Sequence, residues 1–152
     1  MPLPIIHSET YKLHNPAFEI WPGGWIREYF ESPQRVEIIL AALRSTGWTE
    51  ARAPEAASIE PIAAVHDRNY MEYLQHGYRH WLATNPETLE GHAPTYYATT
   101  FPPPRSQRRG DQYGNYTFDQ SAPLVEGTFE AIVGSAQCAI TAANLILNDQ
   151  RT

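Results

Sequence analysis

Apolar side chains recur every three or four positions in three stretches of the chain, residues 32–46, 67–84 and 127–148. This spacing brings them to one face of an α-helix, so each stretch is predicted to form an amphipathic helix with a buried stripe. Ser32 and Gly47 are residue types that favour the start and the end of the first helix. The stripes consist of Val36, Ile39, Leu40 and Leu43 in the first helix, of Tyr70, Tyr73, Leu74, Tyr78, Trp81 and Leu82 in the second, and of Phe129, Ile132, Val133, Ala136, Ile140, Ala143 and Leu147 in the third.

Shorter elements lie before and between these helices. Two apolar runs, residues 3–7 and 49–53, are candidates for short strands, and residues 59–65 are predicted to form a brief helix. Residues 15–29 are rich in aromatic residues, proline and glycine, which argues against a helix and predicts an ordered loop held by its large side chains. The pattern therefore predicts a mostly helical chain with two short strands.

A long stretch without periodicity separates the second and third large helices. Residues 85–121 contain five prolines and a basic cluster of Arg105, Arg108 and Arg109. Loops of this length are uncommon inside compact domains and tend to be functional or disordered, while the tyrosines in this stretch argue against plain disorder. We therefore expect an excursion that packs against another surface, such as a second subunit.

The composition, with 42% hydrophobic and 18% charged residues, is that of one globular domain rather than a disordered chain. The net charge of -6 disfavours nucleic acid and anionic membranes as partners and favours cationic ligands. No run approaches eighteen uninterrupted apolar residues and the N-terminus lacks signal-peptide features, so we expect a cytoplasmic protein without a transmembrane helix or membrane partner. The single cysteine, Cys138, is expected to be a buried structural thiol.

Few residues in the sequence indicate metal or nucleophile chemistry. With one cysteine a zinc site of paired cysteines is impossible, and the sequence has neither a glycine-rich phosphate loop nor a serine-nucleophile motif. His76 and His80 lie four apart on one helical face and could hold a metal, but no third ligand accompanies them. We therefore interpret His76 and His80 as two polar residues on a half-exposed helix. Asp67, which follows His66, is better explained as a helix N-cap than as part of a site.

Four carboxylates lie in or beside segments rich in aromatic residues: Glu19, Glu31, Asp111 and Asp119. A carboxylate next to aromatic rings suits a protonated amine, because ion pairing and cation–π attraction then act together. Solvated surface acids are the alternative, and the residue pattern alone favours them. On this evidence the chain is a soluble domain of unknown activity.

Four segments, taken in order, resemble acetylpolyamine amidohydrolases of the histone deacetylase superfamily. They are HNPAFE (residues 14–19), ESPQRVEIILAAL (31–43), AVHDRNYMEYLQ (64–75) and FDQSAPLVEGTFEAIVGSAQCAITAANLIL (118–147). The resemblance covers almost the whole chain, and a long proline-rich excursion is also a feature of that family. It implies the α/β class: the N-terminal portion of an arginase/deacetylase-like fold, mostly helical, with one or two short parallel strands and a long proline-rich loop.

The resemblance also implies roles for individual residues. Arg35 matches an arginine that lines the interior channel behind the active site, with a buried helix-anchoring ion pair as the alternative. Asp119 matches a loop aspartate that hydrogen-bonds the substrate at the pocket rim. Glu19 matches a loop glutamate associated with polyamine selectivity and the neighbouring subunit, and Asp111 lies only near a second such acid. Residues 87–109 would be the dimer-interface element that narrows the substrate channel.

In this family a zinc ion held by two aspartates and a histidine activates water to hydrolyse an amide, helped by paired histidines and a tyrosine. All of these groups are expected to follow the last helix, so residues 1–152 are interpreted as a single truncated segment with no catalytic residues, metal ligands or cofactor. We expect the apolar face of the last helix to be left exposed and to drive self-association, alone or with the excursion. The alternative is a self-standing oligomerising or polyamine-binding module without catalysis.

Overall fold

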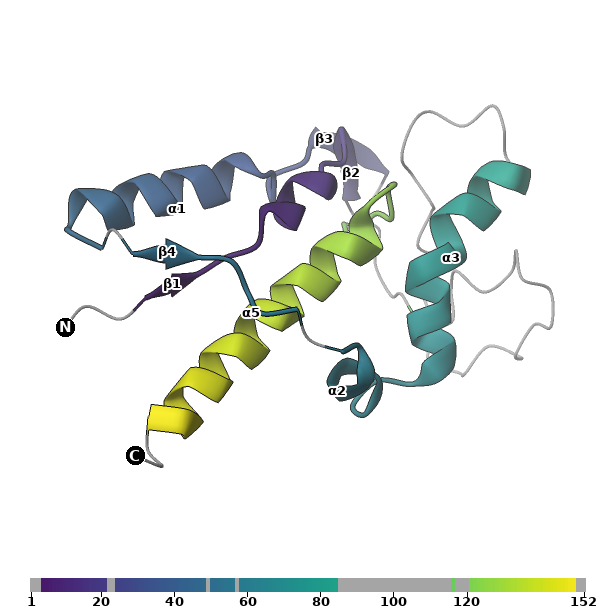
Figure 1. Ribbon diagram of the computed structural model, residues 1–152. Helices are drawn as coiled ribbons and strands as arrows, with labels where there is room; N and C mark the ends of the chain where they lie inside the picture. The colour runs from purple at the N-terminus through teal and green to yellow at the C-terminus, as the bar shows by residue number, and fades with distance from the viewer. Residues whose placement is uncertain are drawn as a thin grey trace.

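The computed structural model describes residues 4–21, 24–48, 50–56, 58–84, 116 and 121–149 (Figure 1). In chain order its elements are β1 (Ile5–Ile6), η1 (Glu9–Leu13), β2 (Phe18–Trp21), β3 (Trp25–Glu28), α1 (Gln34–Ser45), β4 (Ala51–Arg52), α2 (Glu60–Ala63), α3 (Arg68–Thr84) and α5 (Thr128–Asp149). The four predicted helices are confirmed within a few residues as α1, α2, α3 and α5, whereas the sequence pattern does not predict the short 3-10 helix η1. The proline-rich excursion lies outside the described residues, except for Tyr116 and Ser121.

Helix α5 lies at the centre of the described part. It contacts η1, β1 and α3, and in Figure 1 it crosses the middle of the view, with β1 and β4 to one side and α3 to the other. At Gly134 the helix lies close to η1, because a Cβ atom there would overlap Thr10 Oγ1 and come 2.8 Å from Ser8 Oγ. Only glycine therefore lets η1 lie this close to the helix.

Capping residues explain where two of the helices begin and end. Asp67 Oδ1 accepts hydrogen bonds from the backbone N–H groups of Asn69 and Tyr70 at 2.8 and 3.4 Å, which confirms the predicted N-cap of α3. The predicted cap of α1 is wrong, because no side-chain capping hydrogen bond is made at its start, where Ser32 is expected to provide one. Gly47, with a φ of +90°, follows the end of α1 as predicted.

The two predicted strands are confirmed and pair in parallel. Ile5 of β1 lies opposite Ala51 of β4, and the backbone N–H of His7 donates to the carbonyl of Arg52 at 3.2 Å. Helix α1 lies between these strands in the chain, which supplies the long connection that parallel pairing requires. Short parallel strands joined through a helix agree with the expected α/β class.

Residues 15–29 contain a β-hairpin, so the prediction of an ordered loop without strands is wrong. Strands β2 and β3 pair antiparallel, with Trp21 opposite Trp25 near the turn and Phe18 opposite Glu28 at the base. Gly24 has a φ of +80°, and its N–H donates to the carbonyl of Trp21 at 3.0 Å. Aromatic and β-branched residues on both sides of a glycine turn favour paired strands, because the cross-strand hydrogen bonds satisfy backbone groups that a loop leaves open. The fold therefore has an antiparallel pair besides the parallel one.

A small aromatic core lies between α3 and the segment that precedes α5. Its buried centre is Tyr73 and Leu124, which are 3% and 4% exposed. The partly buried side chains around them are Tyr70, Leu74, Tyr78, Trp81 and Tyr116. This confirms the aromatic stripe of α3 as core, except for Leu82, which is 37% exposed.

The apolar faces of α1 and α5 are only partly covered. In α1, Leu40 is buried but Ile39 is 54% exposed, so the predicted buried stripe is wrong for that side of the helix. In α5, Ala131 and Thr141 are buried, whereas Leu147 is 53% exposed. Within the described ranges, the parallel strands have two residues each and are too short to cover two long helices. Self-association through these exposed faces stays a prediction.

One helix of the described residues, Thr128–Asn148, is long and apolar enough to cross a membrane by length and composition, with a mean hydropathy of 1.4. The expectation that no stretch qualifies is wrong by this measure, because a mean over the window tolerates the scattered polar residues that interrupt every apolar run. In the structure the helix contacts η1, β1 and α3, and 17% of this window is buried.

Candidate functional site

Strand β2 places a carboxylate under an aromatic side chain. Glu19 is only 5% exposed, and its Oε1 accepts a hydrogen bond from the indole N–H of Trp21. The two side chains share one face of the strand because they are two residues apart. Trp21 is itself 43% exposed, and its ring lies 6.1 Å from that of Phe30, which is 61% exposed. The buried acid is therefore hydrogen-bonded to an indole that is itself partly exposed to solvent.

A second group of polar side chains, from three different segments of the chain, is linked by hydrogen bonds. His14 Nδ1 lies 2.9 Å from Thr128 Oγ1 at the start of α5, and His14 Nε2 lies 2.9 Å from the hydroxyl of Tyr29 after β3. Burial lowers the pKa of His14, so its ring is neutral at pH 7, with one nitrogen donating and the other accepting. Thr128 Oγ1 also accepts a hydrogen bond from the backbone N–H of Val125 at 2.9 Å, so this hydroxyl links His14 to the segment that precedes α5.

Tyr29 connects this group to the acid. Burial first, and the charge of Glu19 second, raise the pKa of Tyr29, while the charge of Arg35 lowers it. Arg35 forms an ion pair with Glu31 one turn away, and their side chains are 52% and 65% exposed. The ion pair therefore forms, but it is exposed and not buried as the alternative predicted, because no described element covers this end of α1. The channel role of Arg35 stays a prediction.

The structure thus gathers two of the four residues to which the resemblance gives roles, Glu19 and Arg35, around Tyr29. The other two, Asp111 and Asp119, lie outside the described residues, and their predicted contacts with the amine stay predictions. Sequence reasoning missed His14 and Thr128. His14 opens the first segment that carries the resemblance, but its partner is 114 residues away, and local spacing does not indicate such a pairing.

The rings of His76 and His80 lie on α3 with centroids 6.0 Å apart. Across the described ranges, no three His, Cys, Asp or Glu side chains come close enough together to hold a metal ion. Cys138 is half-buried on α5, and burial raises the pKa of its thiol, which disfavours the reactive thiolate. Neither the histidine pair nor the cysteine forms part of a larger reactive cluster in this part of the chain.

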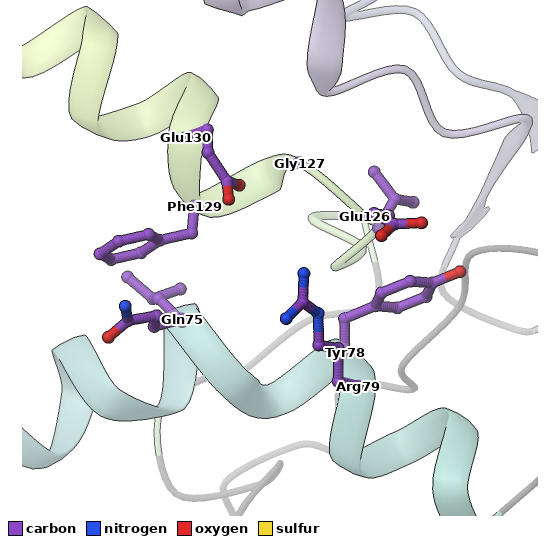
Figure 2. Close-up of a pocket in the computed structure, with 9 residues that line it drawn as sticks. Gln75, Tyr78, Arg79, Glu126, Gly127, Phe129 and Glu130 are labelled. Carbon is purple, nitrogen blue, oxygen red and sulfur yellow. The ribbon is translucent and has the colours of Figure 1, made fainter.

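A small cavity lies between α3 and the start of α5. Figure 2 shows Arg79 reaching from α3 toward the segment of Glu126 and Gly127, and Glu130 also borders the space. Its volume is about 30 Å³, which is room for roughly one water molecule. This cavity is therefore too small for an organic ligand.

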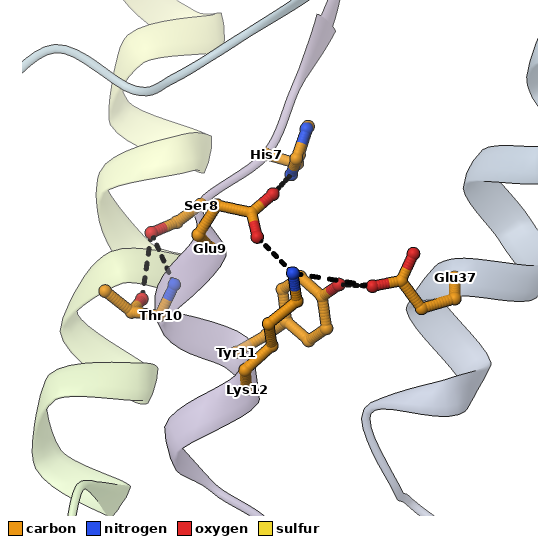
Figure 3. A network of polar contacts seen from close by, with 7 residues as sticks. All are labelled: His7, Ser8, Glu9, Thr10, Tyr11, Lys12 and Glu37. Carbon is orange, nitrogen blue, oxygen red and sulfur yellow. Dashed lines mark hydrogen bonds and ion pairs between the residues drawn. The ribbon is translucent and has the colours of Figure 1, made fainter.

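A network of exposed side chains fastens η1 to α1 (Figure 3). The Glu37 carboxylate accepts a hydrogen bond from the Tyr11 hydroxyl and lies 3.6 Å from Lys12 Nζ, which also pairs with Glu9. The hydrogen bond from Tyr11 lowers the pKa of Glu37, desolvation partly opposes it, and the charge of Lys12 lowers the pKa further. Both carboxylates are solvated, so the network is a surface contact between η1 and α1.

Comparison with protein families identifies a matching domain. The family described as "Histone deacetylase domain" matches residues 29–152, which is most of the chain.

Comparison with individual proteins gives relatives that are longer than this chain. Acetylpolyamine amidohydrolase 1 of Pseudomonas aeruginosa is 35% identical over 144 residues, which are 90% of this chain and 40% of that protein. Acetylpolyamine amidohydrolase of Mycoplana ramosa is 33% identical over 93% of this chain and 41% of its own length. A crystal structure of acetylpolyamine aminohydrolase from Burkholderia pseudomallei superposes with a TM-score of 0.83 at 29% identity, over 95% of this chain and 41% of that one. The chain therefore spans about 40% of the length of these relatives.

Proposed function

Since the chain belongs to the histone deacetylase family, we propose that it is part of an enzyme that hydrolyses the amide bond of acetylated polyamines. Support comes from the relatives named as acetylpolyamine amidohydrolases, which the chain matches over nine tenths or more of its length. Within such an enzyme we assign Glu19, Trp21 and Phe30 to recognition of the free amine end of the substrate.

The observation that carries this assignment is the hydrogen bond from the partly exposed indole of Trp21 to the buried carboxylate of Glu19, with the exposed ring of Phe30 next to that indole. An ammonium group is bound well by a carboxylate, because the hydrogen bonds are charge-assisted, and well by aromatic faces, because of cation–π attraction. Trp21 and Phe30 supply the rings and Glu19 supplies the charge. The acidic net charge of the chain, -6, adds a long-range attraction for cations.

We further propose that residues 1–152 by themselves do not hydrolyse the amide. The resemblance implies a zinc ion, and the described residues do not fit one, because they contain no cluster of three suitable side chains. We therefore derive no catalytic step from them. We expect no release of acetate from an acetylated diamine and no zinc in the purified chain by mass spectrometry. Turnover accompanied by one zinc ion per chain would contradict this proposal.

Replacing Glu19 with glutamine tests the recognition site. Glutamine keeps the size and can still accept the indole hydrogen bond, but it removes the charge that attracts an ammonium ion. We expect the affinity of the chain for putrescine, measured by titration calorimetry, to fall at least about tenfold, as for the loss of a charge-assisted hydrogen bond.

The matched control is Glu28→Gln, on the paired strand opposite Phe18. Glu28 is exposed, and an exposed charge contributes little to binding a small cation, so its loss should leave the affinity unchanged. Equal losses in both variants would show that only the net charge matters. Equal binding by the wild type and Glu19→Gln would remove Glu19 from the site.

A further inference from the structure

We propose that Trp21 is a gate on the Glu19 carboxylate: its indole N–H holds the acid until an ammonium ion displaces it, which makes the site select cations over neutral amides. This inference rests on the proposed function, since it concerns the same carboxylate. It assigns to Trp21 the role of a residue that sets specificity by acting on Glu19.

The indole is the solvent-facing partner of the buried acid. Glu19 is 5% exposed, and Tyr29, whose pKa responds to its charge, is 8% exposed. Trp21 is 43% exposed and donates its N–H to Glu19. A ligand that approaches the acid from solvent on this side therefore meets the indole first.

The chemistry of the two donors decides which ligands can pass. A buried carboxylate without a hydrogen bond is costly, so the indole cannot leave unless another donor takes its place. Indole offers one neutral N–H, whereas an ammonium ion offers up to three N–H groups together with a full positive charge, so it adds ion pairing to the hydrogen bonding. A neutral amide also offers only a neutral N–H, and it gains nothing from the exchange. The acetylated end of a polyamine is therefore refused, and the free ammonium end is accepted.

The aromatic rings keep a function after the exchange. Trp21 and Phe30 lie side by side, with ring centroids 6.1 Å apart, and both are exposed. An indole released from the acid can turn its face to the bound cation, where cation–π attraction stabilises it. Displacement of the hydrogen bond is thus partly offset by a contact with the same side chain.

Trp25 provides an internal control for this proposal. It lies directly opposite Trp21 in the hairpin and is 67% exposed. Among the described residues its indole makes no hydrogen bond, whereas that of Trp21 binds the acid. Replacing each with phenylalanine therefore removes the same atoms from the same hairpin, but only Trp21→Phe frees the carboxylate.

The test uses the four chains wild type, Trp21→Phe, Trp25→Phe and Glu19→Gln, with putrescine as the cation and N-butylacetamide as the neutral probe. Calorimetry should show that Trp21→Phe binds putrescine about tenfold more tightly than the wild type, since the competing hydrogen bond to a charged group is gone. Trp25→Phe should bind putrescine as the wild type does, and N-butylacetamide should not bind to the wild type.

Nuclear magnetic resonance of the ¹⁵N-labelled chain adds a readout that a merely structural role would not move. The indole N–H signal that is missing in Trp21→Phe identifies Trp21. Saturating putrescine should shift this signal upfield, and Glu19→Gln should shift it in the same direction without ligand, because both remove the charged acceptor. The signal of Trp25 should stay in place.

Two results separate the gate from the site beneath it. If Glu19→Gln abolishes binding while Trp21→Phe and Trp25→Phe bind alike, the gate is overturned and the amine site stands. If the wild type and Glu19→Gln bind putrescine alike, or neither binds it, the site is overturned and the gate with it. An unmoved Trp21 signal at saturating putrescine also overturns the gate.

Discussion

Gly127→Ala is expected to lower the free energy of unfolding by about 2–4 kcal/mol, the sum of a strained backbone and an overfilled contact. Gly127 has a φ of +85°, a region that residues with a Cβ atom rarely adopt. Its carbonyl accepts the N–H of Ala131 at 3.0 Å in the first turn of α5. An added Cβ would lie 2.7 Å from Leu13 Cβ and 2.9 Å from the Leu13 carbonyl oxygen, and backbone atoms cannot turn aside.

The two contributions can be separated with a second glycine. Gly47 has a φ of +90°, and a Cβ built on it meets no atom within 4 Å, so Gly47→Ala carries the backbone strain alone. Urea denaturation followed by circular dichroism should place the midpoints in the order wild type, Gly47→Ala, Gly127→Ala. A midpoint for Gly127→Ala at or above that of Gly47→Ala would mean that α5 and the end of η1 are not this close.

Gly134→Ala is expected to destabilise the chain by about 1–3 kcal/mol, even though alanine is the better helix former by about 1 kcal/mol. The added Cβ would overlap Thr10 Oγ1 and lie 3.2 Å from Ser8 Cβ. Thr10 would have to rotate and break its 2.8 Å hydrogen bond to Ser8, or η1 would have to move away from α5. Either change weakens the contact on which the central helix depends.

Gly77→Ala is the matched control, because Gly77 also lies in the middle of a helix. A Cβ there would come 3.2 Å from Leu124 Cδ1 and 3.3 Å from a ring atom of Tyr73, a contact that small side-chain shifts can relieve. We expect Gly77→Ala to be close to neutral in the same denaturation measurement, since the helical gain offsets the crowding. Equal effects of the two substitutions would contradict the close packing of η1 on α5.

The difference between what could and could not be predicted follows the range of the interactions. The helices were predictable because each apolar stripe is a local property: the spacing within α3 or α5 defines its buried face wherever the helix lies. The N-cap role of Asp67 was predictable for the same reason. The hairpin was missed although its signal was local, because the aromatic residues of β2 and β3 were interpreted as anchors of a loop instead of as strand formers.

The exposure of individual side chains could not be predicted from local spacing. The spacing of Ile39 and Leu147 assigns them to apolar faces, but burial also needs a second surface, and none of the described elements supplies it. For the same reason the ion pair of Arg35 could be anticipated from Glu31 four residues before it, but its exposure could not.

The amino-acid sequence by itself determined the helical segments, because these depend on residue types and short spacings. It also carried the family resemblance, which selected Glu19 as an amine-binding candidate. Only the structure shows that Trp21 donates a hydrogen bond to Glu19 and that His14 forms hydrogen bonds with both Tyr29 and Thr128. Only the structure shows that η1 packs closely against Gly134. Contacts such as His14 to Thr128 span 114 residues, and they exist only once α5 has packed across the N-terminal elements. Packing selects one arrangement from the many that are compatible with the same local pattern.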